Sequence, residues 1–309
     1  IQSTENGGAL LLKNAGLNCT NIVFSGCQAK QGQSGNTNSN ESGGGGGIYI
    51  KNEIGTSNPI LLNSVNFSNC KAKYGGALFI YSSSVSSPVK IINCQFTTNQ
   101  ATSTSYSNNL EQSGGSAIFI TSRDLFISDC NFFKNIGESQ LKVENVFNQT
   151  NNEKNSKILQ GQPATSNVIR FCRFVIEKQA QCSLYYKTGE NGVLCKLMNS
   201  VFVGNLSPGN YHINGKMLTQ NSPKLVVVGC KFSTDYLWAY KRDGDNEYIL
   251  IQLQKQTFDY NENDDDNDDD SNKDIYGYAL FGFAAVLVVV ILIVLAIQID
   301  KPDNLSVIY

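Results

Sequence analysis

Short apolar runs recur along the chain, and each is bounded by glycine, asparagine or serine. The clearest stretch lies between Phe67 and Leu78, F-S-N-C-K-A-K-Y-G-G-A-L. It generalises to F-x-x-[N/C]-x-A, a short spacer, and G-G-[A/G]-[L/I]. The runs are short and rich in β-branched and aromatic residues, which favours strands over helices. The pattern therefore predicts an all-β fold.

The phrase repeats with an uneven period, which is typical of a solenoid whose coils share a core and differ in their loops. Successive repeat phenylalanines are 43, 29, 36, 42, 28 and 30 residues apart. One coil cannot bury its apolar face alone, whereas stacked coils bury a continuous core. We expect about seven coils in a right-handed parallel β-helix, because parallel crossovers are right-handed in nearly all cases. The repeat phenylalanines are Phe24, Phe67, Phe96, Phe132, Phe174, Phe202 and Phe232, and the G-G half occurs at Gly7, Gly46, Gly75 and Gly114.

Alignment of the repeats predicts which side chains enter the core. Two residues before each Phe stand small or medium residues, from Ile22 to Cys230, which should share the inward face of the Phe. In the G-G strands the second and fourth places are always Leu or Ile, and the preceding glycine allows a positive φ. Three residues after Phe96 and Phe132 come asparagines whose amides can hydrogen-bond from coil to coil.

The third place of the G-G strands carries the candidate ligand site. If the second and fourth places point inward, Tyr49, Phe79 and Phe119 point outward and stack as an aromatic column. Such a column is suited to hold sugar rings. Two alternatives stay open: the inserted loops cover these rings as a satellite core, or the inward and outward faces are reversed.

The F-x-x-N-x-A and G-G-A-[I/L] phrases resemble the repeats of the polymorphic outer membrane protein family. The likeness is good over about residues 7–135 and poor over 136–235, where the G-G-A half is lost. It implies a right-handed parallel β-helix. Members of that bacterial family end in a membrane β-barrel, whereas this chain ends in a predicted helix. Similar repeats on helix-anchored surface proteins of unicellular eukaryotes are the nearer resemblance, and they imply adhesion or an unassigned surface role.

The rest of the chain divides into four segments after the β-helix of residues 1–235. Residues 236–258 are expected to form cap strands. Residues 259–274 hold nine acidic residues against one Lys and read as a disordered stalk rather than a calcium loop, since EF-hand spacing is absent. Residues 275–299 carry no charge and are expected to span a bilayer as one helix. Residues 300–309 form a short cytoplasmic tail, and their presence disfavours a GPI signal.

Cysteines and sequons support a location outside the cell. Cysteines in the inward column are expected to act as small hydrophobes, whereas Cys27 and Cys70 occupy neighbouring turn positions within disulfide range. A second candidate pair is Cys182 with Cys195. Together with the span, the sequons suggest a glycosylated type I ectodomain with its N-terminal side outside. The sequon asparagines are Asn18, Asn40, Asn66, Asn148 and Asn205.

The composition narrows the function. The net charge is −2 and there is one histidine, so neither nucleic-acid binding nor a zinc site is expected. No cofactor is expected. Glu177 and Asp235 stand at turn positions two coils apart, about 10 Å, which is beyond the separation of a glycosidase pair, and no enzyme activity is expected. The sequence thus predicts a single-pass plasma-membrane surface protein for adhesion or recognition of a glycan or protein. The alternatives are a structural coat protein and, third, a polysaccharide-active enzyme.

Overall fold

The computed structural model describes 13 segments of the chain, all within the compact unit Ile1–Asp259. In these segments every element is a strand, and no helix is present that is long and apolar enough to cross a membrane. The described part is therefore all-β. The segments are residues 2–3, 6–30, 43–52, 57–82, 87–102, 114–146, 166–177, 182–189, 192–204, 212–218, 222–223, 225–233 and 249–252.

Four sheets of parallel strands make up the fold, here called sheets A to D. Sheet A contains β1 (Gln2–Ser3), β5 (Gln28–Ala29), β9 (Lys71–Ala72) and β13 (Gln100–Ala101). Sheet B contains β2 (Leu10–Lys13), β6 (Ile48–Asn52), β10 (Leu78–Ser82), β14 (Gly115–Ser122), β17 (Ser139–Asn145), β20 (Cys182–Thr188) and β23 (Ile213–Met217).

Sheets C and D are the other two long sheets. Sheet C contains β3 (Leu17–Thr20), β7 (Ile60–Asn63), β11 (Val89–Ile92), β15 (Leu125–Ser128), β18 (Ser166–Arg170), β21 (Leu194–Met198), β24 (Leu225–Val228) and β26 (Ile249–Gln252). Sheet D contains β4 (Val23–Ser25), β8 (Asn66–Ser68), β12 (Gln95–Thr97), β16 (Asn131–Phe133), β19 (Arg173–Val175), β22 (Val201–Val203) and β25 (Lys231–Phe232).

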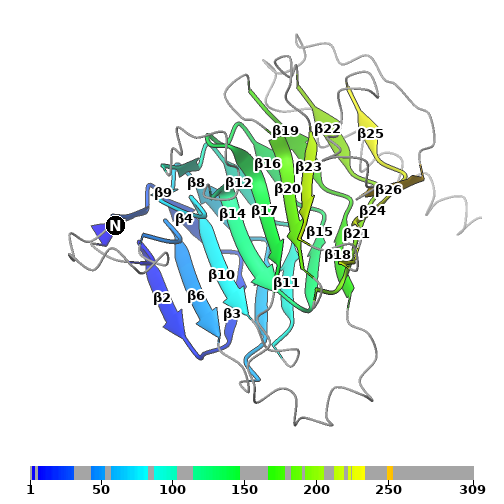
Figure 1. The fold of residues 1–309 in the computed structure, drawn as a ribbon. Coiled ribbons are helices and arrows are strands. Elements are labelled where there is room, and N and C mark those ends of the chain that lie inside the picture. Colours follow the sequence, from blue (N-terminus) through cyan, green and yellow to red (C-terminus); the bar gives the residue numbers. More distant parts are fainter. Residues whose placement is uncertain are drawn as a thin grey trace, which may run out of the picture. The chain divides into compact units, whose positions relative to one another are not determined.

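From β2 to β13 the described chain visits the sheets in the order B, C, D and A, and from β14 to β25 the order is B, C and D. Each new strand lies beside the strand of the same sheet in the preceding coil (Figure 1). Every strand pair is parallel, from β1 with β5 to β24 with β26. Sheets B and D each have seven strands, which agrees with the expected number of coils. The topology is consistent with a parallel β-helix, and the predicted solenoid of parallel strands is confirmed at that level.

The repeat phenylalanines form one continuous ladder inside the solenoid. Adjacent rings from Phe24 to Phe232 are stacked, with centroids 4.6–5.1 Å apart and interplanar angles of 3–12°. The rings from Phe67 to Phe202 are fully buried, and Phe24 at the first coil is half-buried. Stacked aromatic pairs add about 0.5–1.5 kcal/mol each beyond the area they bury, so this ladder ties each coil to the next.

The residues two positions before each repeat phenylalanine form a column at the corner between sheets C and D, outside the strands. Val65, Cys94 and Cys130 are fully buried there, as predicted, whereas Ile22 on the first coil is 40% exposed. The thiols of Cys94 and Cys130 donate to the carbonyl two residues earlier, at 3.2 Å in both cases. These cysteines therefore help to close the corner as well as filling the core.

Each C–D corner is turned by one residue in the left-handed region. Asparagine is the residue type most often found at this corner. It is suited to the position because Asn adopts the left-handed conformation more easily than most other residues with a side chain. The corner residues and their φ angles are Asn21 (57°), Ser64 (54°), Asn93 (53°), Asp129 (56°), Phe171 (51°), Asn199 (47°) and Gly229 (65°).

The turn asparagines pass hydrogen bonds between coils as predicted. The amide of Asn99 donates to the Phe67 carbonyl at 3.0 Å, and the amide of Asn135 donates to the Phe96 carbonyl at 2.8 Å. Asn99 also donates to the side-chain oxygen of Asn135 at 3.0 Å. Both asparagines are buried, so the ladder satisfies polar groups that burial would otherwise leave unpaired.

The two glycines of the G-G phrase serve different purposes. Gly75 has a φ of 57°, which lets the chain turn into β10. At Gly76 an added Cβ would lie 2.1 Å from the Ser116 carbonyl oxygen of the next coil. The first glycine therefore provides the turn, and the second allows two backbones to approach.

Three predicted segments lie outside the described residues: the acidic stalk (259–274), the bilayer-spanning helix (275–299) and the tail (300–309). Of the predicted cap segment 236–258 only β26 is described, and it extends sheet C beside β24. These four expectations stay predictions.

Candidate functional site

The predicted aromatic column is present on the outer face of sheet B. Tyr49, Phe79 and Phe119 stand in register on β6, β10 and β14. Both ring pairs are stacked with centroids 4.9 Å apart, and neither Tyr49 nor Phe79 belongs to the main core. The predicted outward direction is therefore confirmed.

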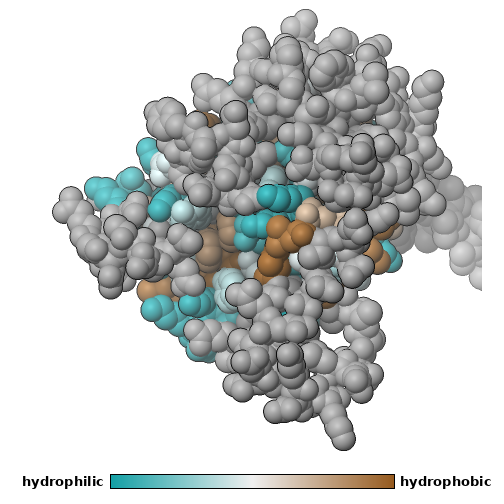
Figure 2. Space-filling view, viewed as in Figure 1, coloured by the Kyte–Doolittle hydropathy of each residue, from teal (hydrophilic) through white to brown (hydrophobic). Residues whose placement is uncertain are grey.

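The column is nevertheless covered. Tyr49 is 1% exposed and Phe79 is 6% exposed, while Phe119 is half-buried. Among the described residues, Gly44 lies close to the rings of Tyr49 and Phe79, and Tyr74 packs edge-on against Phe119 with centroids 6.3 Å apart. The column thus has the character of a satellite core, one of the two alternatives that the sequence left open. Figure 2 views this side and shows hydrophobic and hydrophilic atoms mixed over the described strands.

A buried lysine continues the column beyond the aromatic residues. Lys142 on β17 follows Phe119 in register, and Tyr185 on β20 follows Lys142. The ammonium group lies 5.1 Å from the centroid of Phe119 and 5.4 Å from that of Tyr185, and it forms an ion pair with Glu144 at 3.2 Å. Burial lowers the pKa of Lys142, and the Glu144 carboxylate partly opposes this shift. The arrangement stabilises the coil-to-coil packing where the G-G phrase is lost.

Polar side chains replace alanine inside the later coils. Ala77 and Ala117 stand directly before the inward pair Leu78 and Ile118. The matching positions, directly before Leu141, Leu184 and Ile213, are Gln140, Ser183 and His212, all fully buried. The Ser183 hydroxyl lies 3.1 Å from Nδ1 of His212. Burial lowers the pKa of His212 to about 3, so the imidazole is neutral at physiological pH. In the described part of the chain no cluster of His, Cys, Asp and Glu is suited to hold a metal ion.

All nine cysteines are buried free thiols in this structure. Cys27 and Cys70 lie at adjacent turns, where the Lys71 amide donates to the Cys27 carbonyl at 2.8 Å. Cys182 begins β20 and Cys195 lies within β21. Burial raises the pKa of the Cys182 and Cys195 thiols, and it raises the pKa of Cys70 to about 12. The two disulfide pairings stay predictions.

Two of the five sequon asparagines are described, and both are exposed. Asn18 points outward from β3 and Asn66 from β8. Asn40, Asn148 and Asn205 lie outside the described residues. Both described positions are open to carry a glycan.

Only one of the two turn carboxylates considered for an enzyme is described. Glu177 is exposed and forms an ion pair with Lys134 at 3.4 Å, and Asp235 lies outside the described residues.

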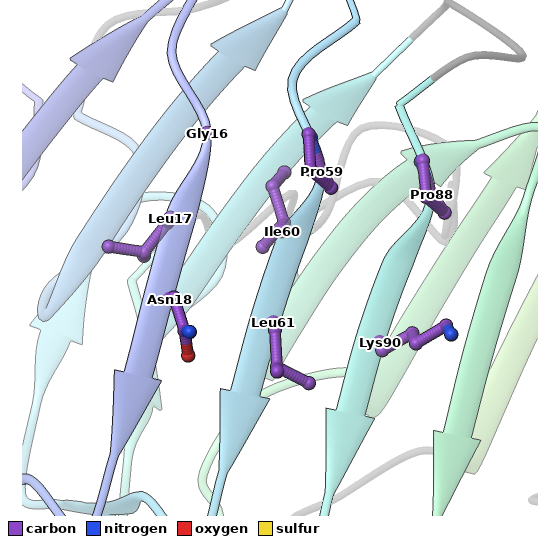
Figure 3. Close-up of a pocket in the computed structure, with 8 residues that line it drawn as sticks. All are labelled: Gly16, Leu17, Asn18, Pro59, Ile60, Leu61, Pro88 and Lys90. Carbon is purple, nitrogen blue, oxygen red and sulfur yellow. The ribbon is translucent and has the colours of Figure 1, made fainter.

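A shallow groove of about 460 Å³ lies on the outer face of sheet C. It crosses β3, β7 and β11, and its floor follows the outward row Asn18, Leu61 and Lys90, which are register partners (Figure 3). Apolar residues form most of its lining, while Asn18 and Lys90 provide polar groups. This combination of apolar surface and few polar groups is typical of ligand-binding grooves. The lining residues are Gly16, Leu17, Asn18, Pro59, Ile60, Leu61, Pro88 and Lys90.

The sequence contained a signal for this groove that the repeat alignment on phenylalanine did not use. Gly16, Pro59 and Pro88 each precede a strand of sheet C by one residue. Their carbonyls continue the pairing: the Leu17 amide donates to Pro59 and the Ile60 amide to Pro88, at 3.0 and 2.9 Å. A column of Gly and Pro at strand starts leaves no long side chain over the groove. A second alignment, made on the residue before each sheet C strand, would have shown it.

Comparisons with known proteins give no relative for this chain. No protein-family model, no curated protein and no solved structure matches it.

Proposed function

We propose that the solenoid is the recognition ectodomain of a single-pass surface protein, anchored by residues 275–299 with its N-terminal side outside. The observation that carries this proposal is the groove over β3, β7 and β11. In contrast to the buried column of sheet B, it is open, and it combines apolar lining with an exposed lysine and an exposed asparagine. A glycan or an extended peptide fits these properties, because both present apolar and hydrogen-bonding groups along one line.

The groove also suits adhesion because of its geometry. Its three strands run side by side with a spacing of about 4.8 Å, so a linear ligand crossing them meets Asn18, Leu61 and Lys90 in turn. Contacts of this kind extend along a chain rather than enclosing a small molecule. Weak contacts of that type gain strength when many copies on a surface bind together.

Replacing Leu61 by Arg tests the proposal. Leu61 is half-buried on the outer face of β7, so Arg fills the groove while β7 keeps its pairing. The control is Gln95→Arg, an exposed outward position on β12 in sheet D. The full chain, purified in a mild detergent, is screened on a glycan array and on intact cells. We expect selective binding that falls at least tenfold with Leu61→Arg and less than twofold with Gln95→Arg. Equal binding by both variants would refute the groove as the site.

A coat function is the second candidate, and the exposed sequons favour it. Asn18 lines the groove itself, so a glycan attached there would occupy the groove. Mass spectrometry of the chain secreted from a eukaryotic host decides between the two. Full occupancy of Asn18, together with no selective binding by the folded protein, would favour the coat. An unmodified Asn18 would leave the groove free for an external ligand.

A further inference from the structure

One corner residue breaks the pattern of the C–D column. Six of the seven left-handed corner residues are Asn, Asp, Ser or Gly, and the seventh is Phe171 with a φ of 51°. A bulky side chain in this region is strained and uncommon. The ring is also 49% exposed. The corner therefore carries a strained backbone and an exposed aromatic ring where an asparagine would form the turn more easily, and strain of this kind is concentrated at functional sites.

An arginine holds the exposed ring next to a second aromatic residue. The guanidinium carbon of Arg170 lies 5.3 Å from the centroid of Phe171 and 4.8 Å from that of Phe126. Arg170 Nε donates to the Ser128 hydroxyl at 3.3 Å, and that hydroxyl donates to Asp129. These contacts fix the orientation of the guanidinium group, because it is held at its Nε and against two rings.

Three further cations flank this group along the stack. Lys196 lies beside Val168, two residues before Arg170 on the same face of sheet C. Arg173 begins β19, and its row on sheet D runs through Val201 to Lys231. Arg173, Lys196 and Lys231 are exposed.

Within the described residues no carboxylate forms a direct ion pair with these four cations. The ion pairs Lys134 with Glu177 and Lys142 with Glu144 lie elsewhere in the fold. The one acidic residue among the described left-handed corner residues is Asp129, and it accepts a hydrogen bond from the Ser128 hydroxyl. In a chain with a net charge of −2, this corner is a local excess of positive charge.

We propose that this corner patch, formed by Phe126, Arg170, Phe171, Arg173, Lys196 and Lys231, binds an anionic polysaccharide. The guanidinium groups match sulfate or carboxylate groups geometrically, and the exposed ring of Phe171 offers a flat apolar surface to the C–H face of a sugar. Arg173 and Lys231 are two coils apart, about 10 Å, which is comparable with the length of a disaccharide. A glycan with one charge per disaccharide, lying along this row, would meet Arg173 and Lys231 at successive disaccharides.

This inference does not depend on the proposed function. The corner patch lies on β15, β18, β19, β21 and β25, whereas the groove crosses β3, β7 and β11. A negative binding result at one site therefore leaves the proposal for the other site unaffected.

Binding to soluble chains of defined charge tests the inference. The full chain in a mild detergent is titrated with dextran sulfate, alginate and uncharged dextran. Single-stranded DNA and polyglutamate of similar charge, and vesicles containing phosphatidylserine, are measured in parallel. We expect binding to a charged glycan, weaker binding to DNA and polyglutamate, none to dextran, and a loss of affinity with added salt. Dextran sulfate and alginate distinguish sulfate from carboxylate as the preferred group.

Two variants locate the site. Reversing Arg173, Lys196 and Lys231 to Glu should lower the affinity at least tenfold. The control reverses Lys13, Lys30 and Lys71 to Glu, which changes the net charge equally, and it should alter the affinity less than twofold. Phe171→Asn should fold at least as well as the original chain, because Asn forms this corner at Asn21, Asn93 and Asn199, and should weaken glycan binding several-fold.

Three outcomes would overturn the proposal: no binding to either charged glycan, equal losses for the two charge-reversed proteins, or DNA, polyglutamate or vesicles binding as tightly as the glycans while Phe171→Asn changes nothing. The last result would mean that the corner patch recognises negative charge alone and not a glycan.

Discussion

The outer faces of sheets B and C belong to the same coils, and yet one is closed and the other is open. On sheet B the outward row is aromatic, and Tyr49 and Phe79 are almost completely buried. On sheet C the outward residues of the same two coils are Leu61 and Lys90, which are half-buried and exposed and line the groove together with Asn18 of the preceding coil. Strand alternation alone therefore does not decide which face of a solenoid meets solvent.

The chain preceding each strand accounts for part of the difference. Before β6 the run Gly43–Gly47 brings the backbone against the rings, and Gly44 has no side chain to hold it away. Before β7 and β11 stand Pro59 and Pro88, whose short rings form the rim of the groove. Glycine thus allows the chain to fold over one face, while proline directs it straight into the strand on the other.

The largest difference between the two faces should be seen on removing an aromatic ring. Phe79→Ala deletes a ring stacked on both sides and 6% exposed, and should destabilise the fold by about 3–5 kcal/mol. Phe126→Ala deletes a half-buried ring on sheet C and should cost about 1 kcal/mol. Denaturant unfolding of the full chain measures both. Equal losses would mean that the face of sheet C is as closed as that of sheet B.

The next largest difference in stability between the two faces should come from removing a carboxylate that lies near a lysine. Glu144→Gln removes the carboxylate that forms an ion pair with the buried Lys142, and should cost about 2 kcal/mol because the ion pair of a buried charge is lost. Asp124→Asn is the matched change on sheet C, where burial raises the pKa of the carboxyl and Lys90 opposes the shift. It should be neutral within about 0.5 kcal/mol. Melting temperatures of both variants provide the comparison, and a neutral Glu144→Gln would contradict it.

Lys142 should also give the closed face a distinctive pH dependence. Its folded-state pKa is lowered below 10.5, first by burial, so in the window between the folded pKa and 10.5 the unfolded chain binds the extra proton. Stability from this residue therefore rises with pH through that window. The difference in unfolding free energy between the original chain and Lys142→Met should shift in favour of the original chain as the pH rises from 7 to 10. A difference that shifts the other way would mean that the folded pKa is raised.

The smallest effect should come from the open face. Leu61→Asn changes a half-buried side chain that lines only the groove, and its cost should stay within about 0.5 kcal/mol. The same substitution at Ile80, an inward residue of sheet B with no exposure, is the contrasting control and should cost several-fold more. A large loss at Leu61 would place this side chain in the core, contrary to its outward direction.

The sequence predicted the fold where residue types repeat and predicted the site less well where they do not. The phenylalanine ladder, the Asn99–Asn135 hydrogen bonds and the positive φ of Gly75 all follow from alternation and turn chemistry that recur at the same position of successive coils. The predicted aromatic column was placed in the correct direction. Its burial depends on packing between segments far apart in the chain, which a repeat pattern does not contain.

The corner patch and the groove were missed for a different reason. Phe171 stands three residues before a repeat phenylalanine, where every other coil has Asn, Asp, Ser or Gly. The signal is an exception to the repeat, and it becomes visible only when the corner position is known. Lys142 and Tyr185 were missed because the G-G phrase is absent there, although the in–out–in pattern of L-K-V and L-Y-Y continues unchanged.

The phenylalanine ladder also affects how this protein can change over generations. Each coil presents the same ring to the coil before it and to the coil after it, with centroid spacings that vary by only 0.5 Å between 4.6 and 5.1 Å. At the ladder any coil therefore fits against any other, and a gene that duplicates or loses one repeat creates ring contacts that already match. Recombination between repeats can lengthen or shorten the solenoid in whole coils, of 28 to 43 residues in this chain. The reach of the molecule can thus evolve separately from the surfaces it carries.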